Sequence, residues 1–276
     1  MIVKLANKIE QSHGEFFHPT NASARMNNFI NDQNWVDLSK QFINATPFRH
    51  VIIDNFWKAD IAQALVADFP NYESSVWTAH YQNSVEDKKT CNHWDRFPAA
   101  TYRAFTYLNS QEFLNIVEPI IGTDVKTDIG LHGGGWHSHH KGGKLNVHLD
   151  YNIHPKLNLK RHYNLIIYMT PDWNPKWNGG LELWSNDPKI NQPMECVQTV
   201  ENKFNRAVLF DTTQYSWHGL PDELSCPNGV YRSSIAVYYL TDPEEGADQR
   251  SRALFTPNKD QSNDPAVLEL IKQRSN

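Results

Sequence analysis

The chain has 276 residues, of which 39% are hydrophobic and 21% are charged, and its formal net charge is −5. A chain of this length can bury roughly three quarters of its unfolded surface, so a substantial core is expected. No run of Lys or Arg is longer than two residues. This pattern predicts no nucleic-acid footprint and no attachment to an anionic membrane.

The three cysteines, Cys91, Cys196 and Cys226, are widely spaced. Their number and spacing argue against a disulfide framework and a CxxC metal site, and favour a reducing compartment. The first fifteen residues contain no apolar run of signal-peptide length, and no later stretch approaches the ~20 apolar residues of a bilayer span. We therefore expect a cytoplasmic protein with a small-molecule or peptidyl partner. The oligomeric state is left open.

Residues 1–57 are polar and Asn-rich and are interpreted as an N-terminal extension. Within it, Trp35, Leu38 and Phe42 have helical spacing, and residues 48–56 are typical of a strand. We expect the extension to contribute one helix and one strand.

Residues 58–129 are predicted to form a helical support. Apolar residues four apart from Ile61 predict a helix that stops at Pro70. A second helix is predicted to begin near Asn109, where Glu112 suits a capping box, and to end before Pro119.

From residue 130 the signals become those of short strands separated by Gly and Pro clusters, which is typical of an antiparallel sandwich or barrel. The fold class is therefore expected to be mainly β with flanking helices, and residues 130–242 are predicted to form a jelly-roll core within one domain. A tail over 243–276 ends in a helix from Pro265 to Gln273, capped by Asp264. The predicted strands cover 145–150, 162–169, 180–184, 206–210, 215–218 and 232–240.

Two H-x-D sequences occur, where chance alone predicts about one in a chain of this composition. His93-Trp94-Asp95 lies in a segment without strand alternation and is interpreted as accidental. In the second, the period-2 geometry of a strand turns His148 and Asp150 to the same face, so both side chains can reach one ion. This pair is the better candidate for metal binding.

The third metal ligand must come from another strand, and His218 follows the apolar strand 207–210 at a short distance. Two imidazoles and one carboxylate hold non-haem Fe(II) and leave coordination positions open. His154 and His162 compete for the third position, and spacing alone gives about even odds that all of these are ordinary histidines.

Arg232 begins a strand on which Ser234 and Ala236 share its face. A guanidinium is a planar, permanently charged match to a carboxylate. It suits the anchor of a dicarboxylate co-substrate. A surface arginine at a strand start is the alternative interpretation, and it would be favoured if the residue stood alone.

Taken together, the residues resemble the Fe(II)- and 2-oxoglutarate-dependent oxygenases of the prolyl-hydroxylase-like branch, in a bacterial-type subgroup. The likeness covers about residues 130 to 242 and depends on the order of several motifs more than on any one of them. The motifs are His148-Leu149-Asp150, Ile167-Tyr168-Met169, Trp177-Asn178-Gly179-Gly180-Leu181-Glu182-Leu183, Asn205-Arg206-Ala207-Val208-Leu209-Phe210, Trp217-His218-Gly219 and Tyr231-Arg232-Ser233-Ser234.

The resemblance implies a double-stranded β-helix and a hydroxylase that uses Fe(II), 2-oxoglutarate and O2 and releases succinate and CO2. It implies that His148, Asp150 and His218 bind iron, and that Arg232 and Tyr168 bind 2-oxoglutarate. Arg232 follows His218 at a distance of fourteen positions, a longer spacing than is common in prolyl hydroxylases.

Other residues are assigned from their positions. Ser234 and Asn164 are candidates for contacting 2-oxoglutarate, Asn164 because it lies an even number of residues before Tyr168. His137, Asn152 and His154 flank the metal strand and are candidate substrate ligands, although loop hydrogen bonding is the more common role of such residues.

The Gly-rich segments 133–135 and 142–143 are predicted to bracket a histidine-rich hairpin or lid. The substrate is expected to be a small molecule, an amino acid or peptidyl group, or a sugar derivative. Two alternatives remain: a cupin-like metalloenzyme that does not use 2-oxoglutarate, and a non-catalytic jelly-roll module that binds carbohydrate.

Overall fold

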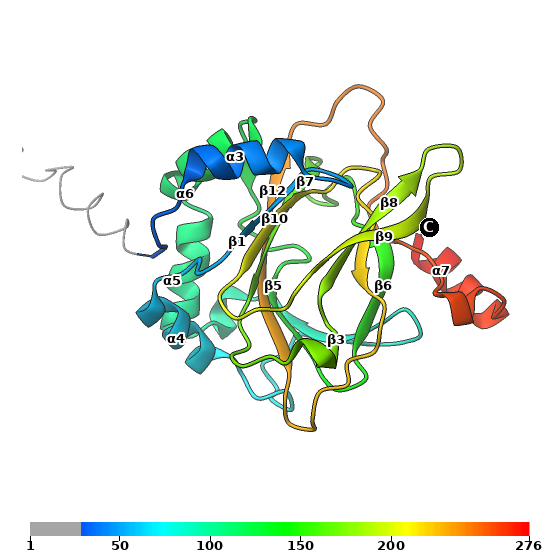
Figure 1. Ribbon diagram of the computed structural model, residues 1–276, viewed down its shortest axis with the longest axis horizontal. Helices are drawn as coiled ribbons and strands as arrows, with labels where there is room; N and C mark the ends of the chain where they lie inside the picture. The colour runs from blue at the N-terminus through cyan, green and yellow to red at the C-terminus, as the bar shows by residue number, and fades with distance from the viewer. Residues whose placement is uncertain (1–28, 276) are drawn as a thin grey trace, which may run out of the picture.

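The computed structural model describes residues 29–275. The expectations for the first fifteen residues, and most of the N-terminal extension, lie outside this range. A single sheet winds into an open barrel, with helices packed against one side of it and a C-terminal helix on the other (Figure 1). No helix in the described range is long and apolar enough to cross a membrane.

Every strand pairing of the sheet is antiparallel. The order β1-β10-β7-β12-β5-β3-β6-β11-β8-β9 brings strands that are distant in sequence side by side, as a jelly roll requires. The mainly β fold with flanking helices, a double-stranded β-helix, is therefore confirmed. The strands are β1 (His50–Ile53), β2 (Ala79–Gln82), β3 (Glu86–Cys91), β4 (Lys126–Thr127), β5 (Gly135–His139), β6 (Lys144–Leu149), β7 (Lys160–Tyr168), β8 (Leu181–Asp187), β9 (Gln192–Val200), β10 (Ala207–Asp211), β11 (His218–Leu220), β12 (Arg232–Thr241) and β13 (Leu254–Phe255).

The main hydrophobic core lies between the helices and the outer face of β1, β10, β7 and β12. Apolar residues of β7 such as Leu165 and Ile167 meet Phe42, Phe105 and Phe113 from the helices, all of them buried. The helices are α3 (Trp35–Asn44), α4 (Ala59–Asp68), α5 (Ala99–Leu108), α6 (Gln111–Ile121) and α7 (Pro265–Ser275), and three short 3-10 turns cover Trp94–Arg96, Pro175–Trp177 and Lys259–Gln261. This packing leaves the opposite face of β7 and β12 free to line the barrel interior.

The helix predictions are confirmed for α3, α4 and α7, whereas α6 differs at both ends. Its N-cap is Ser110, whose hydroxyl accepts from the backbone N–H of Phe113, and not Asn109. The helix also continues past Pro119 to Ile121. Ile120 and Ile121 are buried, and the Ser39 hydroxyl donates to the carbonyl of Pro119, so packing outweighs one lost helical hydrogen bond.

Two further expectations are corrected by the sheet. The predicted helical support over 58–129 also contains strands β2 and β3, and β3 pairs with β5 and β6 inside the barrel wall. The histidine-rich segment between Gly135 and His139 is not a lid, because it forms strand β5 between β12 and β3. Strand β11 begins at His218, where the predicted strand ended.

Candidate metal centre

A cavity of about 190 Å³ opens inside the barrel. Its walls come from the inward faces of β3, β5, β6, β7, β11 and β12, and α7 closes one end with Arg274. The polar lining residues are Tyr81, Glu86, Lys88, Thr90, His137, His139, His148, Asp150, Arg161, Asn164, His218, Arg232, Ser234, Tyr238 and Arg274.

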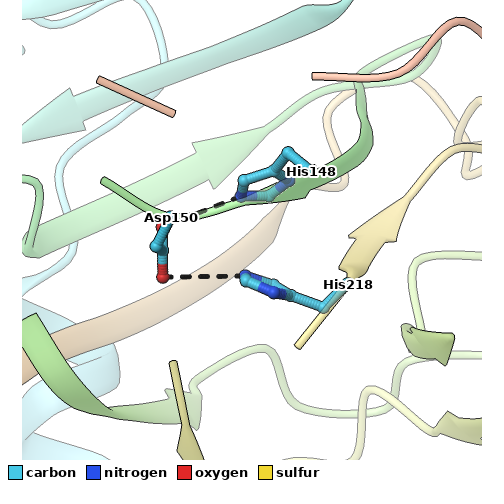
Figure 2. Close-up of side chains that lie close together, drawn as sticks. All are labelled: His148, Asp150 and His218. Carbon is cyan, nitrogen blue, oxygen red and sulfur yellow. Dashed lines mark ion pairs between the residues drawn. The ribbon is translucent and has the colours of Figure 1, made fainter. Parts of the chain in front are cut away.

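Three of these side chains meet at one point (Figure 2). His148 lies on β6 and Asp150 follows the end of that strand, while His218 begins β11 and pairs directly with His148 across the two strands. His148 Nε2 lies 3.8 Å from Asp150 Oδ1, and His218 Nε2 lies 3.7 Å from Asp150 Oδ2. One ligand atom from each residue lies within 4.8 Å of the others.

The backbone fixes the orientation of both imidazoles. His148 Nδ1 lies 2.9 Å from the carbonyl oxygen of Asn146, and His218 Nδ1 lies 2.7 Å from that of Ser216. Because a carbonyl oxygen only accepts, each Nδ1 carries the proton and donates it. Each Nε2 then presents a lone pair toward the shared point, which is the tautomer that a metal ligand needs.

The electrostatics of the cavity favour the same protonation states. Burial lowers the pKa of His148 to about 3, with repulsion from His218 as the next cause, and burial also lowers the pKa of His218. Burial alone would raise the pKa of Asp150, but Arg161 and the two imidazoles bring it to about 2. Neutral imidazoles and an ionised carboxylate are what a divalent cation requires.

Arg161 is a cavity residue that the strand pattern did not reveal. It is 3% exposed, its Nη1 lies 3.5 Å from Asp150 Oδ1, and its guanidinium lies over the ring of Tyr238 at 3.0 Å. Strict alternation from Asn164 would place it on the helix side of β7. A register shift in the pairing with β12 lets Arg161 line the cavity instead.

Arg232 lines the same cavity, on the same face of β12 as Ser234. It is 3% exposed, and its Nε donates to the carbonyl oxygen of Gly179 at 2.6 Å. No carboxylate lies within 4 Å of its guanidinium in residues 29–275. A buried guanidinium without an acidic partner is costly, so this position calls for an anion from outside the chain.

Asn164 lines the cavity on this side, and Tyr168 lies beside Arg232. The Tyr168 ring lies 5.1 Å from the Arg232 guanidinium, and its buried hydroxyl has no hydrogen-bond partner among the described residues. Asn164 Oδ1 is likewise buried and unpaired within the described range. Buried polar atoms normally have partners, so these groups are suited to a polar ligand.

Buried polar atoms without hydrogen-bond partners therefore lie near two groups of opposite charge, the Asp150 carboxylate and the Arg232 guanidinium. Asp150 Oδ2 is buried without a hydrogen bond among the described residues and lies 3.7 Å from His218 Nε2, which suits a cation. The Arg232 guanidinium with the Tyr168 hydroxyl suits a carboxylate. The expected iron and 2-oxoglutarate fit these residues.

Of the three candidate substrate residues, only His137 lines the cavity. Asn152 donates from Nδ2 to the carbonyl of Asp248 at 2.6 Å, and His154 Nδ1 accepts backbone N–H groups of the following turn. Both side chains stabilise the loop after β6 and lie outside the cavity lining. His139, which sequence reasoning did not select, does line the cavity, and both its ring nitrogens are unpaired among the described residues.

Two other histidines considered from the sequence, His93 and His162, lie away from the metal cluster. His93 is exposed beside the 3-10 turn Trp94–Arg96 and is not part of the cluster. His162 lies at the other end of β7, with Nδ1 3.1 Å from the Thr241 hydroxyl, and does not line the cavity.

Comparison with known protein families gives an independent result. The model of the 2OG-Fe(II) oxygenase superfamily matches residues 134–240, from β5 to β12. Prolyl 3-hydroxylase OGFOD1 of Xenopus laevis is 28% identical over 106 residues, which are 37% of this chain and 20% of that protein. The chain thus matches about a fifth of the length of this relative.

Solved structures with the same fold include two prolyl 4-hydroxylases. The enzyme of Pseudomonas putida superimposes with a TM-score of 0.52 and 16% identity, covering 74% of this chain and 98% of its own. The enzyme of Phytophthora capsici gives 0.51 and 18%, covering 95% and 78%. At these identities the likeness establishes the fold.

Proposed function

We propose that this chain is a 2-oxoglutarate- and Fe(II)-dependent oxygenase of the prolyl-hydroxylase-like type, which hydroxylates a small-molecule or peptidyl substrate at the centre formed by His148, Asp150 and His218. The observation that carries this proposal is the pairing of two sites in one cavity. A cluster of metal-ligand type lies in the same barrel as a buried arginine without an acidic partner.

In the proposal, His148, Asp150 and His218 hold Fe(II), and Arg232 binds the distal carboxylate of 2-oxoglutarate. Tyr168, Ser234 and Asn164 contribute hydrogen bonds to the co-substrate. When bound, Fe(II) and 2-oxoglutarate supply the oxidative chemistry, in which O2 is consumed and succinate and CO2 are released.

The chain itself contributes orientation and protonation state. The carbonyl oxygens of Asn146 and Ser216 hold both imidazoles with Nε2 toward the metal position. Arg161 keeps Asp150 ionised and restrains one of its oxygens. Burial within the barrel excludes water, so these charges act in a low-dielectric environment.

His137 is the proposed substrate contact among the three candidates, because it lines the cavity from β5. Its pKa is lowered to about 3 by burial, with Lys88 and Arg232 adding to the effect. The ring is therefore neutral at physiological pH, and its unpaired Nε2 can exchange a hydrogen bond with a neutral polar group.

The test is an anaerobic titration of metal-free protein with Fe(II) and then 2-oxoglutarate, followed through the weak visible charge-transfer band of the chelated complex. We expect the band in wild type, its loss in His148→Ala, and its retention in His93→Ala. The last variant is a matched control because His93 belongs to the other H-x-D sequence and is exposed.

Two outcomes would contradict the proposal. Stoichiometric iron binding without the band would favour the cupin-like alternative, which has no 2-oxoglutarate. A band that survives in His148→Ala would place the metal elsewhere. Succinate release after admission of O2 then provides an assay for candidate substrates.

A further inference from the structure

A second cavity, of about 240 Å³, lies on the outer side of the barrel wall. It is formed by the segment before β8, by β8 itself, by the end of β9 and by the loop after β11. Side chains alternate along β8, so Leu181 lines the metal cavity while Glu182 lines the second one. Leu220 borders both cavities.

One wall of the second cavity carries a buried amide with no partner. Asn202 is 5% exposed, and both its Nδ2 and its Oδ1 lack a hydrogen bond among the described residues. Buried side-chain amides are rarely left unpaired at both atoms in native proteins. Asn202 therefore offers one donor and one acceptor to whatever occupies the cavity.

The same cavity is negatively charged. Glu182, Glu201 and Asp222 line it, and in the described part of the chain only Glu201 has a cation nearby, Arg206 at 3.9 Å. Burial raises the pKa of Glu182, a hydrogen bond that Glu182 Oε2 accepts from the Trp184 indole Nε1 at 2.9 Å lowers it, and the charge of Asp222 raises it. A positive ligand would relieve the two effects that raise the pKa.

An aromatic wall completes the cavity. Trp173 is 8% exposed and lines it, held by a hydrogen bond from its indole Nε1 to the carbonyl oxygen of Asn178 at 2.9 Å. Indole faces attract ammonium and guanidinium groups. The carboxylates do not converge as a metal site would, because the only cluster of that kind in residues 29–275 is the His148 group.

We propose that this second cavity binds an organic cation with a primary ammonium or guanidinium group. Glu182 and Asp222 supply the charge, Asn202 supplies the hydrogen bonds and Trp173 supplies the aromatic contact. The cation belongs either to a basic group of the substrate or to a separate small effector, and the two sources are separated below by experiment.

The cavity also adjoins the co-substrate anchor of the proposed function. Gly179 lines it, and the carbonyl oxygen of Gly179 accepts the hydrogen bond from Arg232 Nε at 2.6 Å. A Cβ at Gly179 would lie 3.0 Å from Arg232 Cδ, so the contact is close. Movement of this glycine on binding would reach Arg232 directly.

The binding experiment needs neither metal nor co-substrate, so its failure is distinct from failure of the proposed function. Metal-free full-length protein is titrated by calorimetry with agmatine, with 1,5-diaminopentane and with the neutral 1,5-pentanediol. We expect both cations to bind and the diol not to bind. Asp222→Asn and Asn202→Ala should each weaken agmatine binding by about tenfold.

Glu223→Gln is the matched control. Glu223 is adjacent to Asp222 and carries the same charge, but it pairs with Lys144 at 3.1 Å and does not line the cavity. This variant should bind agmatine within twofold of wild type. Because Asp222 is exposed, Asp222→Asn is expected to fold normally.

The proposal is overturned if the diol binds as well as the diamine, if no cation binds, or if Asp222→Asn behaves as Glu223→Gln does. Displacement of agmatine by equimolar Mg²⁺ would also overturn it, in favour of a metal site. The two sources of the cation are distinguished by measuring the affinity of Mn²⁺-loaded protein for 2-oxoglutarate with and without agmatine. This measurement rests on the proposed function. A change of threefold or more with saturating agmatine identifies an effector, and no change identifies a basic group of the substrate.

Discussion

Replacing Arg232 with Met tests the proposed co-substrate anchor, because the substitution should not destabilise the ligand-free protein but should weaken its stabilisation by 2-oxoglutarate. Without 2-oxoglutarate, the variant loses a buried charge that has no acidic partner in the described chain. Substituting an apolar side chain for such a charge is neutral or stabilising. The ligand-free variant should therefore unfold at the same temperature as wild type or above it.

In the presence of 2-oxoglutarate, wild type should instead be stabilised more than Arg232→Met. Truncating one partner of a buried, hydrogen-bonded charge pair costs about 2–5 kcal/mol, which raises the dissociation constant roughly 30- to 5,000-fold. At a concentration of about 100 times the wild-type Kd, the ligand stabilises wild type by about 2.7 kcal/mol and the variant by less than about 0.9 kcal/mol.

The assay is thermal unfolding of Mn²⁺-loaded protein with and without 2-oxoglutarate, in the absence of O2. For a chain of this size the wild-type Tm should rise by about 5–11 °C and that of Arg232→Met by no more than about 4 °C. Arg206→Met is the control. It removes an arginine paired with Asp54 at 2.6 Å outside the cavity, so it should lower the Tm of the free protein and keep the ligand shift. A full ligand shift in Arg232→Met would refute the anchor.

Three further predictions concern the metal, the reaction and the barrel. Burial lowers the pKa of His148 to about 3 and also lowers the pKa of His218, so Mn²⁺ affinity measured by calorimetry should fall less between pH 7.5 and 5 than the roughly 1,000-fold loss expected for two ordinary imidazoles. A 1,000-fold loss would contradict the burial argument. Asp150→Ala should abolish succinate formation, and unchanged turnover would remove it from the centre. Gly135→Ala should cost more than about 3 kcal/mol of unfolding free energy in denaturant titrations, because φ is +91° and the new Cβ would lie 2.1 Å from a backbone oxygen of β3. Gly142→Ala is the control and should cost only about 1–2 kcal/mol, because φ is +83° but no atom lies near the new Cβ. Equal losses in the two variants would contradict the steric argument.

Periodicity predicted those parts of the fold in which one face meets the core and the other meets solvent or the cavity. Strand β12 illustrates this, since Arg232, Ser234 and Ala236 all line the cavity, whereas Ile235 and Val237 on the other face belong to the main core. The H-x-D geometry followed from the same rule, because two residues on one face of a strand are brought together by the backbone alone. These local arguments needed no knowledge of the neighbouring strands.

The strands that the sequence did not predict, β3, β5 and β9, do not have one apolar and one polar face. Strand β9 is exposed at most positions and β3 is polar on both faces, so neither carries an apolar period. Strand β5 contains Gly135 and four polar or aromatic residues that suggest a loop, although pairing with β12 and β3 determines its conformation. Arg161 was hidden because a register shift, which depends on the partner strand, reverses the side that it faces.

The geometry also weighs against the two alternatives that the sequence left open. A carbohydrate module has no use for two imidazoles held by Nδ1 with Nε2 directed at a carboxylate, since that arrangement is costly to bury without a cation. A cupin-like enzyme would use the metal cluster but would leave Arg232 buried and unpaired in the same barrel. A dicarboxylate co-substrate would serve both groups, because one of its ends can bind the metal and the other can neutralise the Arg232 guanidinium. The match of residues 134–240 to the 2OG-Fe(II) oxygenase superfamily agrees with this reasoning from burial and charge.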